Sequence, residues 1–174
     1  GRRQRGRGDE GAEEALVHAA AHCVACASCA SRKVLAKVNA LEIRNSQVFV
    51  AMCREQLRLL LASADGADSA AIVSGDGFDV ASQLHDNISP SRIAAMTSSL
   101  HALALAASSE LALGANRSVV VESELGTLVV LRVPSAQAEL LLSVIARSSS
   151  VLGSVLFAAR RCVDTIGQRM SGYA

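Results

Sequence analysis

SVVVESELGTLVVLRVPSAQAELLLSVIA, from Ser118 to Ala146, is the stretch that decides the fold. It contains three apolar runs of strand length: SVVVES (118–123), TLVVLRV (127–133) and ELLLSVIA (139–146). The breaks at residues 124–126 and 134–137 are short, and connections of about 2–5 residues favour sequential hairpins. The stretch therefore predicts three consecutive antiparallel strands.

A hairpin and a long helix precede these strands. The segment AAIVSGDGFDVAS (70–82) has two apolar runs around Gly-Asp-Gly at 75–77, and glycine permits the positive φ angles that tight hairpin turns need. The helix is predicted from about Pro90 to Leu113. Ser89 is its candidate N-cap, and Gly114 suits the position just past its end.

Two further helices complete the domain. One is predicted from about Met52 to Ser63, and the last runs from near Ser150 to near Gly167. The apolar stripe of the last helix consists of Leu152, Val155, Leu156, Ala159, Val163 and Ile166. The resulting order α-β-β-α-β-β-β-α predicts an α+β domain, with a five-stranded antiparallel sheet and helices on its faces.

The long helix is apolar on two sides. We expect one stripe to lie on the sheet: Ile93, Met96, Leu100, Leu103, Ala107 and Leu111. The other side holds Ala94, Ala102, Leu105, Ala106, Ala112 and Leu113. A helix that is apolar all round is normally buried, and exposed apolar patches usually mark interaction sites, so we favour a second partner over a merely Ala-rich helix.

Composition excludes several classes of protein. The 174 residues suffice for one domain with an appendage, and the net charge of +1 argues against a nucleic-acid surface over the whole chain. No apolar run reaches the about 18–20 residues of a membrane span. Five cysteines are a poor disulfide framework and suit a reducing compartment. We therefore expect a soluble, cytoplasmic protein with no nucleic-acid partner and no membrane insertion.

The first 50 residues are interpreted as an N-terminal extension to a domain that spans residues 51–170. Residues 1–11 are rich in glycine and charge and are expected to be disordered. From Ala12 onward the sequence favours helix, with a possible break at Asn45-Ser46, although a segment with little fixed structure remains the alternative.

The extension holds a cluster with metal-ligand residue types: His18, His22, Cys23, Cys26 and Cys29. On a helix four of them form one stripe, but its ends lie too far apart to surround a single tetrahedral ion. No second ligand pair follows. We therefore predict no bound metal, and keep a metal- or redox-responsive module as an alternative.

No catalytic motif is evident. The glycines at 75–77 lack the pattern of a phosphate loop, and Asp76 and Asp79 have no recognisable acid/base set beside them. His85 and His101 are lone histidines, and Arg160 and Arg161 are expected to be solvated. The sequence contains neither a serine-nucleophile elbow nor a dinucleotide-binding fingerprint. We predict no catalytic residue and no cofactor, and therefore not an enzyme.

The complete pattern resembles the roadblock / dynein-light-chain superfamily. The resemblance rests on Ser-Gly-Asp-Gly at 74–77, the Ala-rich helix, VVVE at 119–122, LVV at 128–130, and a last helix opened by Val-Leu-Gly at 151–153. It covers about residues 51–168 and is nearest to the small bacterial members that partner Ras-like GTPases. It implies a roadblock fold of the profilin/longin kind.

The resemblance also implies a dimer, in which the long helices pair and the third strands join edge to edge. On this chain the expected interface is Ala94, Ala102, Leu105, Ala106, Val119, Val120 and Val121. The leading hypothesis is a non-enzymatic homodimeric adaptor that binds a small Ras-like GTPase and modulates its nucleotide cycle. The alternative within the family is a dimeric scaffold with no effect on GTP hydrolysis.

Overall fold

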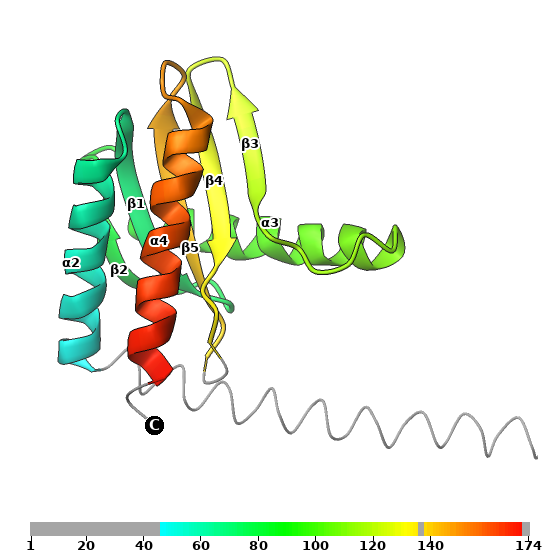
Figure 1. Cartoon of the computed structure of the whole chain (residues 1–174), viewed down its shortest axis with the longest axis horizontal. Helices are drawn as coiled ribbons and strands as arrows, with labels where there is room; N and C mark the ends of the chain where they lie inside the picture. Colours follow the sequence, from blue (N-terminus) through cyan, green and yellow to red (C-terminus); the bar gives the residue numbers. More distant parts are fainter. Residues whose placement is uncertain (1–45, 136–137, 172–174) are drawn as a thin grey trace, which may run out of the picture. The chain divides into compact units, whose positions relative to one another are not determined.

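The computed structural model describes residues 46–135 and 138–171. Its elements are α2 (Gln47–Ser63), β1 (Ala67–Ser74), β2 (Asp79–Gln83), α3 (Pro90–Glu110), β3 (Val119–Ser123), β4 (Gly126–Arg132), β5 (Leu140–Arg147) and α4 (Leu152–Ser171) (Figure 1). The predicted order α-β-β-α-β-β-β-α is thus confirmed.

The five strands form one antiparallel sheet in the order β2-β1-β5-β4-β3. The first hairpin turns where it was predicted: Ser74 N–H donates to the Phe78 carbonyl at 2.8 Å, and Gly77 adopts a positive φ of 87°. Strands β3, β4 and β5 are successive hairpin partners, whereas β5 also pairs with β1. Consequently β2 and β3 are the two edges of the sheet.

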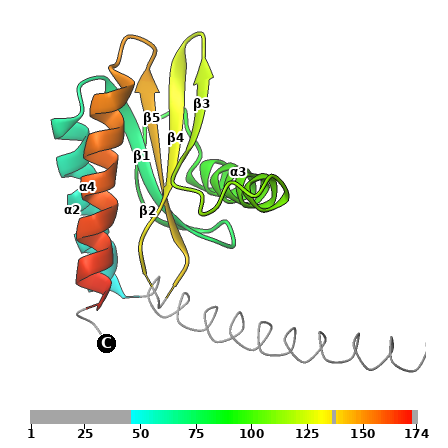
Figure 2. The same cartoon turned by 45° about the vertical axis from the view of Figure 1, so that its right-hand side comes forward.

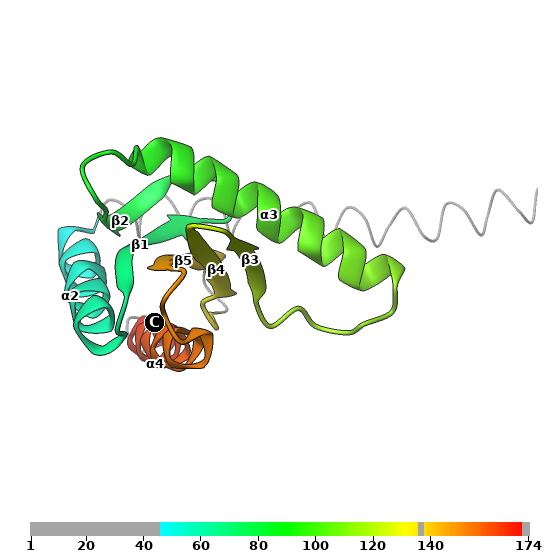
Figure 3. The same ribbon diagram turned by 90° about the horizontal axis from the view of Figure 1, so that it is seen from above.

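Helices cover both faces of the sheet. Helices α2 and α4 lie side by side on one face, and α3 crosses the other (Figures 2 and 3). The larger core lies between the sheet and the α2–α4 layer and includes Leu57, Ile72, Leu142 and Ile166. The smaller core under α3 consists of Ala71, Val73, Ile93, Ala94 and Leu141. Most of the apolar burial therefore serves the α2–α4 face.

Helix α2 begins at Gln47, earlier than the start expected near Met52. Ser46 caps it, since its hydroxyl accepts a hydrogen bond from Phe49 N–H at 3.4 Å. Phe49 is almost fully buried in the larger core. The first helical turn is therefore part of the packed domain.

The prediction of which side of α3 lies on the sheet is confirmed for Ile93 but was wrong for most of the stripe. The buried residues of α3 are Ile93, Ala94, Thr97, His101 and Ser108. Met96, Leu103, Ala107 and Leu111, expected on the sheet, are exposed. For Leu103 and Ala107 one reason is that the second half of α3 runs past β3, the edge strand, so the sheet does not cover it (Figure 3). In contrast, the stripe predicted for α4 is confirmed: four of its members are buried, and Leu152 and Leu156 pack partly against them.

Candidate dimer interface

The outer surface of α3 is unlike an ordinary solvated helix face. Residues 93–109 contain no Asp, Glu, Lys or Arg, although most of them are exposed. Leu103 is 69% exposed, Met96 51% and Leu105 42%. A surface helix of a monomeric protein usually presents charged and polar side chains to water. The outer surface of α3 therefore has the composition of a buried contact.

Small side chains occupy the middle of this outer surface. Ala95, Ser99, Ala102 and Ala106 are spaced three or four residues apart, so they lie along one line of the helix, and all are exposed. The Ser99 hydroxyl donates to the Ala95 carbonyl at 2.8 Å and so is already satisfied within α3. Small residues along a line allow a second helix to approach closely.

The free edge of β3 lies next to this helix. β3 pairs only with β4 among the described strands, so its outer edge has no strand partner. Val119 and Val121 pair with Val130 and Leu128, and their side chains therefore point to the α3 face of the sheet. Val121 is 37% exposed. An exposed, valine-rich edge strand readily pairs with a strand of another chain.

The outer surface of α3 and the free edge of β3 together form one candidate interface, which we call the α3–β3 surface. Of the residues predicted for it, Ala102, Leu105, Ala106, Val120 and Val121 are exposed and Val119 is half-buried. Ala94 does not belong to it, because it is fully buried against the sheet. Met96 and Leu103 are additional members that were assigned to the sheet side. The absence of charged residues between 93 and 109 is the feature of the sequence that could have indicated that Met96 and Leu103 belong to this surface.

The underside of α3 is polar for a helix that covers a sheet. His101 Nε2 lies 3.6 Å from Glu139 Oε1, and neither it nor the buried Thr97 hydroxyl has a hydrogen-bond partner within the described residues. Burial lowers the pKa of the His101 imidazole; the Glu139 carboxylate opposes this effect and the Arg132 guanidinium adds to it. α3 is therefore anchored to the sheet by few apolar contacts, while its larger apolar side chains point outward.

Residues 54–146, more than half of the chain, match the Roadblock/LC7 domain. This chain belongs to the Roadblock/LC7 domain family. The resemblance seen in the sequence is thereby confirmed. No curated protein matches the chain.

Solved structures carry the same fold as this roadblock domain. A Roadblock/LC7 domain from Streptomyces avermitilis superposes with a TM-score of 0.62 at 22% identity, covering 68% of this chain and 97% of its own. MglB from Myxococcus xanthus superposes with a TM-score of 0.65 at 17% identity, covering 72% of this chain and 92% of its own. The gliding protein MglB from Thermus thermophilus superposes with a TM-score of 0.58 at 20% identity, covering 69% of this chain and 91% of its own. At these identities the likeness concerns the fold.

The polar residues singled out in the sequence are dispersed over the roadblock domain. Asp76 is exposed in the first hairpin turn and His85 in the loop after β2. Asp79 is half-buried; burial raises its pKa, and its Oδ2 accepts from the Ser82 hydroxyl at 3.4 Å. None of these side chains meets a partner that would complete an acid/base pair within residues 46–135 and 138–171.

Metal ligands do not gather in the described part of the chain either, which holds no group of three or more His, Cys, Asp or Glu side chains suited to an ion. The cluster formed by His18, His22, Cys23, Cys26 and Cys29 lies outside the described residues. Among the described helices, none has the length and apolar character needed to cross a membrane.

Proposed function

We propose that this roadblock domain is a non-enzymatic homodimeric adaptor, which binds a small Ras-like GTPase and modulates its nucleotide cycle. The observation that carries the proposal is the α3–β3 surface, an uncharged and largely apolar helix face beside a free strand edge. The Roadblock/LC7 family includes GTPase regulators, which supports this class of partner.

The geometry favours a symmetric dimer. Two copies of β3 joined edge to edge in antiparallel fashion are related by a two-fold axis, so each protomer contributes the same surface. The two α3 helices then run over the extended sheet, with Ala102 and Ala106 at their closest approach and Leu103 and Leu105 on either side. Complete burial of the Leu103 and Leu105 side chains would contribute about 1.5–3 kcal/mol each.

The adaptor acts by binding, not by supplying catalytic groups. Within the described residues, neither the α3–β3 surface nor the first hairpin presents a paired acid and base. A paired α3 layer would offer the GTPase a surface made by both protomers. Recognition of one nucleotide state over the other then shifts the population of GTPase conformations.

A direct test uses the full chain and a purified small Ras-like GTPase. Calorimetry measures binding of the GTPase loaded with GDP or with a non-hydrolysable GTP analogue, and phosphate release measures hydrolysis with and without the adaptor. We expect preferential binding of one nucleotide state and an altered rate of hydrolysis or exchange. Binding with unchanged rates would support the scaffold alternative, whereas no binding in either state would contradict the proposal.

A further inference from the structure

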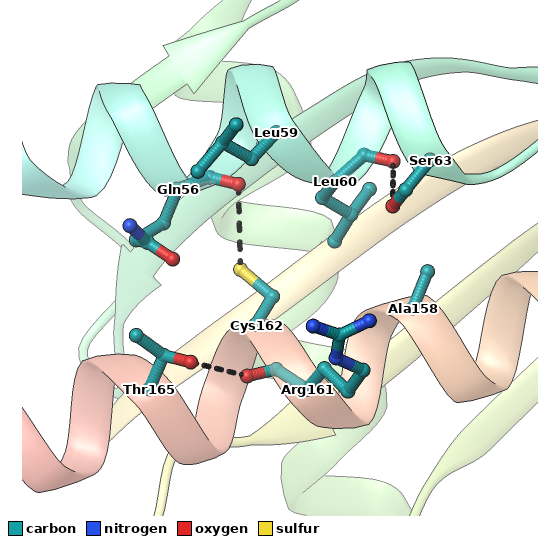
Figure 4. A pocket seen from close by; sticks show the side chains of 8 residues that line it. All are labelled: Gln56, Leu59, Leu60, Ser63, Ala158, Arg161, Cys162 and Thr165. Carbon is teal, nitrogen blue, oxygen red and sulfur yellow. Dashed lines mark hydrogen bonds between the residues drawn. The ribbon is translucent and has the colours of Figure 1, made fainter.

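A groove lies between α2 and α4 (Figure 4). These two helices cover the face of the sheet opposite α3 (Figure 2). The groove has a volume of about 260 Å³. Leu60, Ala158 and Cys162 are buried and form its floor, whereas Leu59 and Arg161 are exposed at its rim. Gln56, Ser63 and Thr165 complete the lining (Figure 4). A groove of this size accommodates one or two apolar side chains.

The small polar groups of this α2–α4 groove are already satisfied by its own helices. The Ser63 hydroxyl donates to the Leu60 carbonyl at 3.0 Å, and the Thr165 hydroxyl to the Arg161 carbonyl at 2.8 Å. The Cys162 thiol is 3.9 Å from the Gln56 carbonyl, and burial raises the pKa of this thiol to about 12, so it stays neutral. What the groove offers to a ligand is therefore apolar surface, the guanidinium of Arg161 and the side-chain amide of Gln56.

Positive charge dominates the helices around the groove. α2 and α4 carry five arginines (Arg54, Arg58, Arg160, Arg161 and Arg169) against two carboxylates, Glu55 and Asp164. Glu55 is engaged by Arg58 at 2.7 and 2.9 Å. The Arg161 guanidinium lies 5.9 Å from the ring centroid of Phe157, which is 64% exposed, and has no carboxylate within ion-pair distance among the described residues.

We propose that the α2–α4 groove is a docking site for a short acidic amphipathic helix of a partner protein. One apolar side chain of that helix enters the groove beside Leu59, and a carboxylate one turn away pairs with Arg161. Charge complementarity selects an acidic partner, because a basic helix would face the excess of arginines. This inference goes beyond the proposed function and does not depend on it, since the groove and α3 lie on opposite faces of the sheet.

The chain contains no tryptophan, so a tryptophan in a probe peptide reports binding without background. The probe is an amphipathic peptide of about 14 residues, with one Trp and two Leu on one face and Glu on the flanks. Its control has every Glu replaced by Lys. With the full chain we expect a blue shift of the Trp emission for the Glu peptide, and binding of the Lys peptide that is weaker by about tenfold or more. Equal binding of both peptides would overturn the proposal.

Two groove variants and one matched control locate the interaction. Arg161→Glu and Leu59→Asp should each weaken binding of the Glu peptide by about tenfold or more. Arg160→Glu makes the same change of charge at the adjacent residue, which does not line the groove, and should weaken binding about twofold at most. Equal losses in Arg160→Glu and Arg161→Glu would show diffuse attraction to arginines and would overturn the site.

The unaltered full chain provides a test that does not depend on how the variants fold. In NMR titrations the Glu peptide should shift the backbone amides of Gln56, Ser63 and Thr165, and leave those of residues 95–106 of α3 unchanged. Shifts confined to α3 would contradict the groove. Binding to vesicles containing phosphatidylserine, with no binding of the peptide, would assign the arginines to a membrane surface and likewise overturn the proposal.

Discussion

His101 Nε2 lies 3.6 Å from Glu139 Oε1, and the buried imidazole joins α3 to the segment that leads into β5. The Glu139 side chain is also close to the first hairpin: a Cβ atom at Gly75 would meet its Cγ at 2.8 Å. Gly75 N–H in turn donates to the Glu139 carbonyl at 2.8 Å. The buried imidazole of His101 therefore lies close to the place where α3, the first hairpin and β5 meet.

This arrangement predicts a pH-dependent stability. Burial lowers the pKa of His101 below its ordinary value of 6.5, so the unfolded chain takes up the proton at a higher pH than the folded chain. This contribution to the free energy of unfolding is fully present above that ordinary value, and it is lost as the pH falls from there through the lower pKa of the folded state. We expect the urea midpoint of the wild type to decrease between about pH 7.5 and about pH 5, and the decrease to be smaller in His101→Gln.

The exposed His85 provides the control for this measurement. His85→Gln should leave the urea midpoint close to that of the wild type, because the side chain of His85 lies in an exposed loop. A His101→Gln variant that loses stability as steeply as the wild type over the same range would contradict a role for the imidazole.

Leu105→Arg should convert the proposed dimer to a monomer. The substitution would place an unpaired charge in the proposed contact between two α3 helices, at a cost of roughly several kcal/mol. Sedimentation at tens of micromolar measures the effect, and Arg160→Ala, on the exposed side of α4, should leave the dimer intact. A wild-type chain that sediments as a monomer, or an unchanged dimer in Leu105→Arg, would contradict the proposal that the α3–β3 surface is a dimer interface.

A chain that begins at Ser46 should unfold with the same cooperative transition as the full chain, because it keeps α2, the Ser46 cap and Phe49. A chain that begins at Met52 loses the cap, the first turn of α2 and Phe49. The missing Phe49 side chain alone should lower the free energy of unfolding by roughly 3–5 kcal/mol. Urea unfolding of both chains measures the difference, and failure of the longer one to fold would place residues before Ser46 in the core.

Gly167→Ala should destabilise the domain by about 1–3 kcal/mol. A Cβ atom at this position of α4 would collide with the carbonyl oxygen of Pro134, which follows β4. Gly153 is the matched control, since it lies in the same helix and a Cβ there would meet nothing within 4 Å. Gly153→Ala should be neutral or stabilising by about 0.5–1 kcal/mol in thermal or urea unfolding. Equal effects of the two substitutions would show that α4 is not held closely against Pro134.

The order of elements could be predicted from sequence because its signals are local. The valine and leucine runs of residues 118–146 form β3, β4 and β5 nearly as expected, and Gly77 turns the first hairpin with its positive φ. The break noticed at Asn45-Ser46 is where Ser46 caps α2, although the helix was expected to begin only near Met52. These features depend on a few neighbouring residues, and so they can be predicted from the sequence alone.

The orientation of α3 was decided by the tertiary structure. Its sequence contains two apolar stripes of similar strength, and the helical period cannot choose between them. The choice follows from how α3 packs across the sheet. Small or polar Ala94, Thr97 and His101 lie beneath it, and Met96 is left on its outer side. The second half of α3 also runs past the edge strand β3, where Leu103 is exposed. The sequence by itself determined which elements form and that α3 is apolar on two sides. Only the packing of α3 across the sheet decided which of its residues are buried and which are exposed, because burial depends on contacts between segments far apart in the chain.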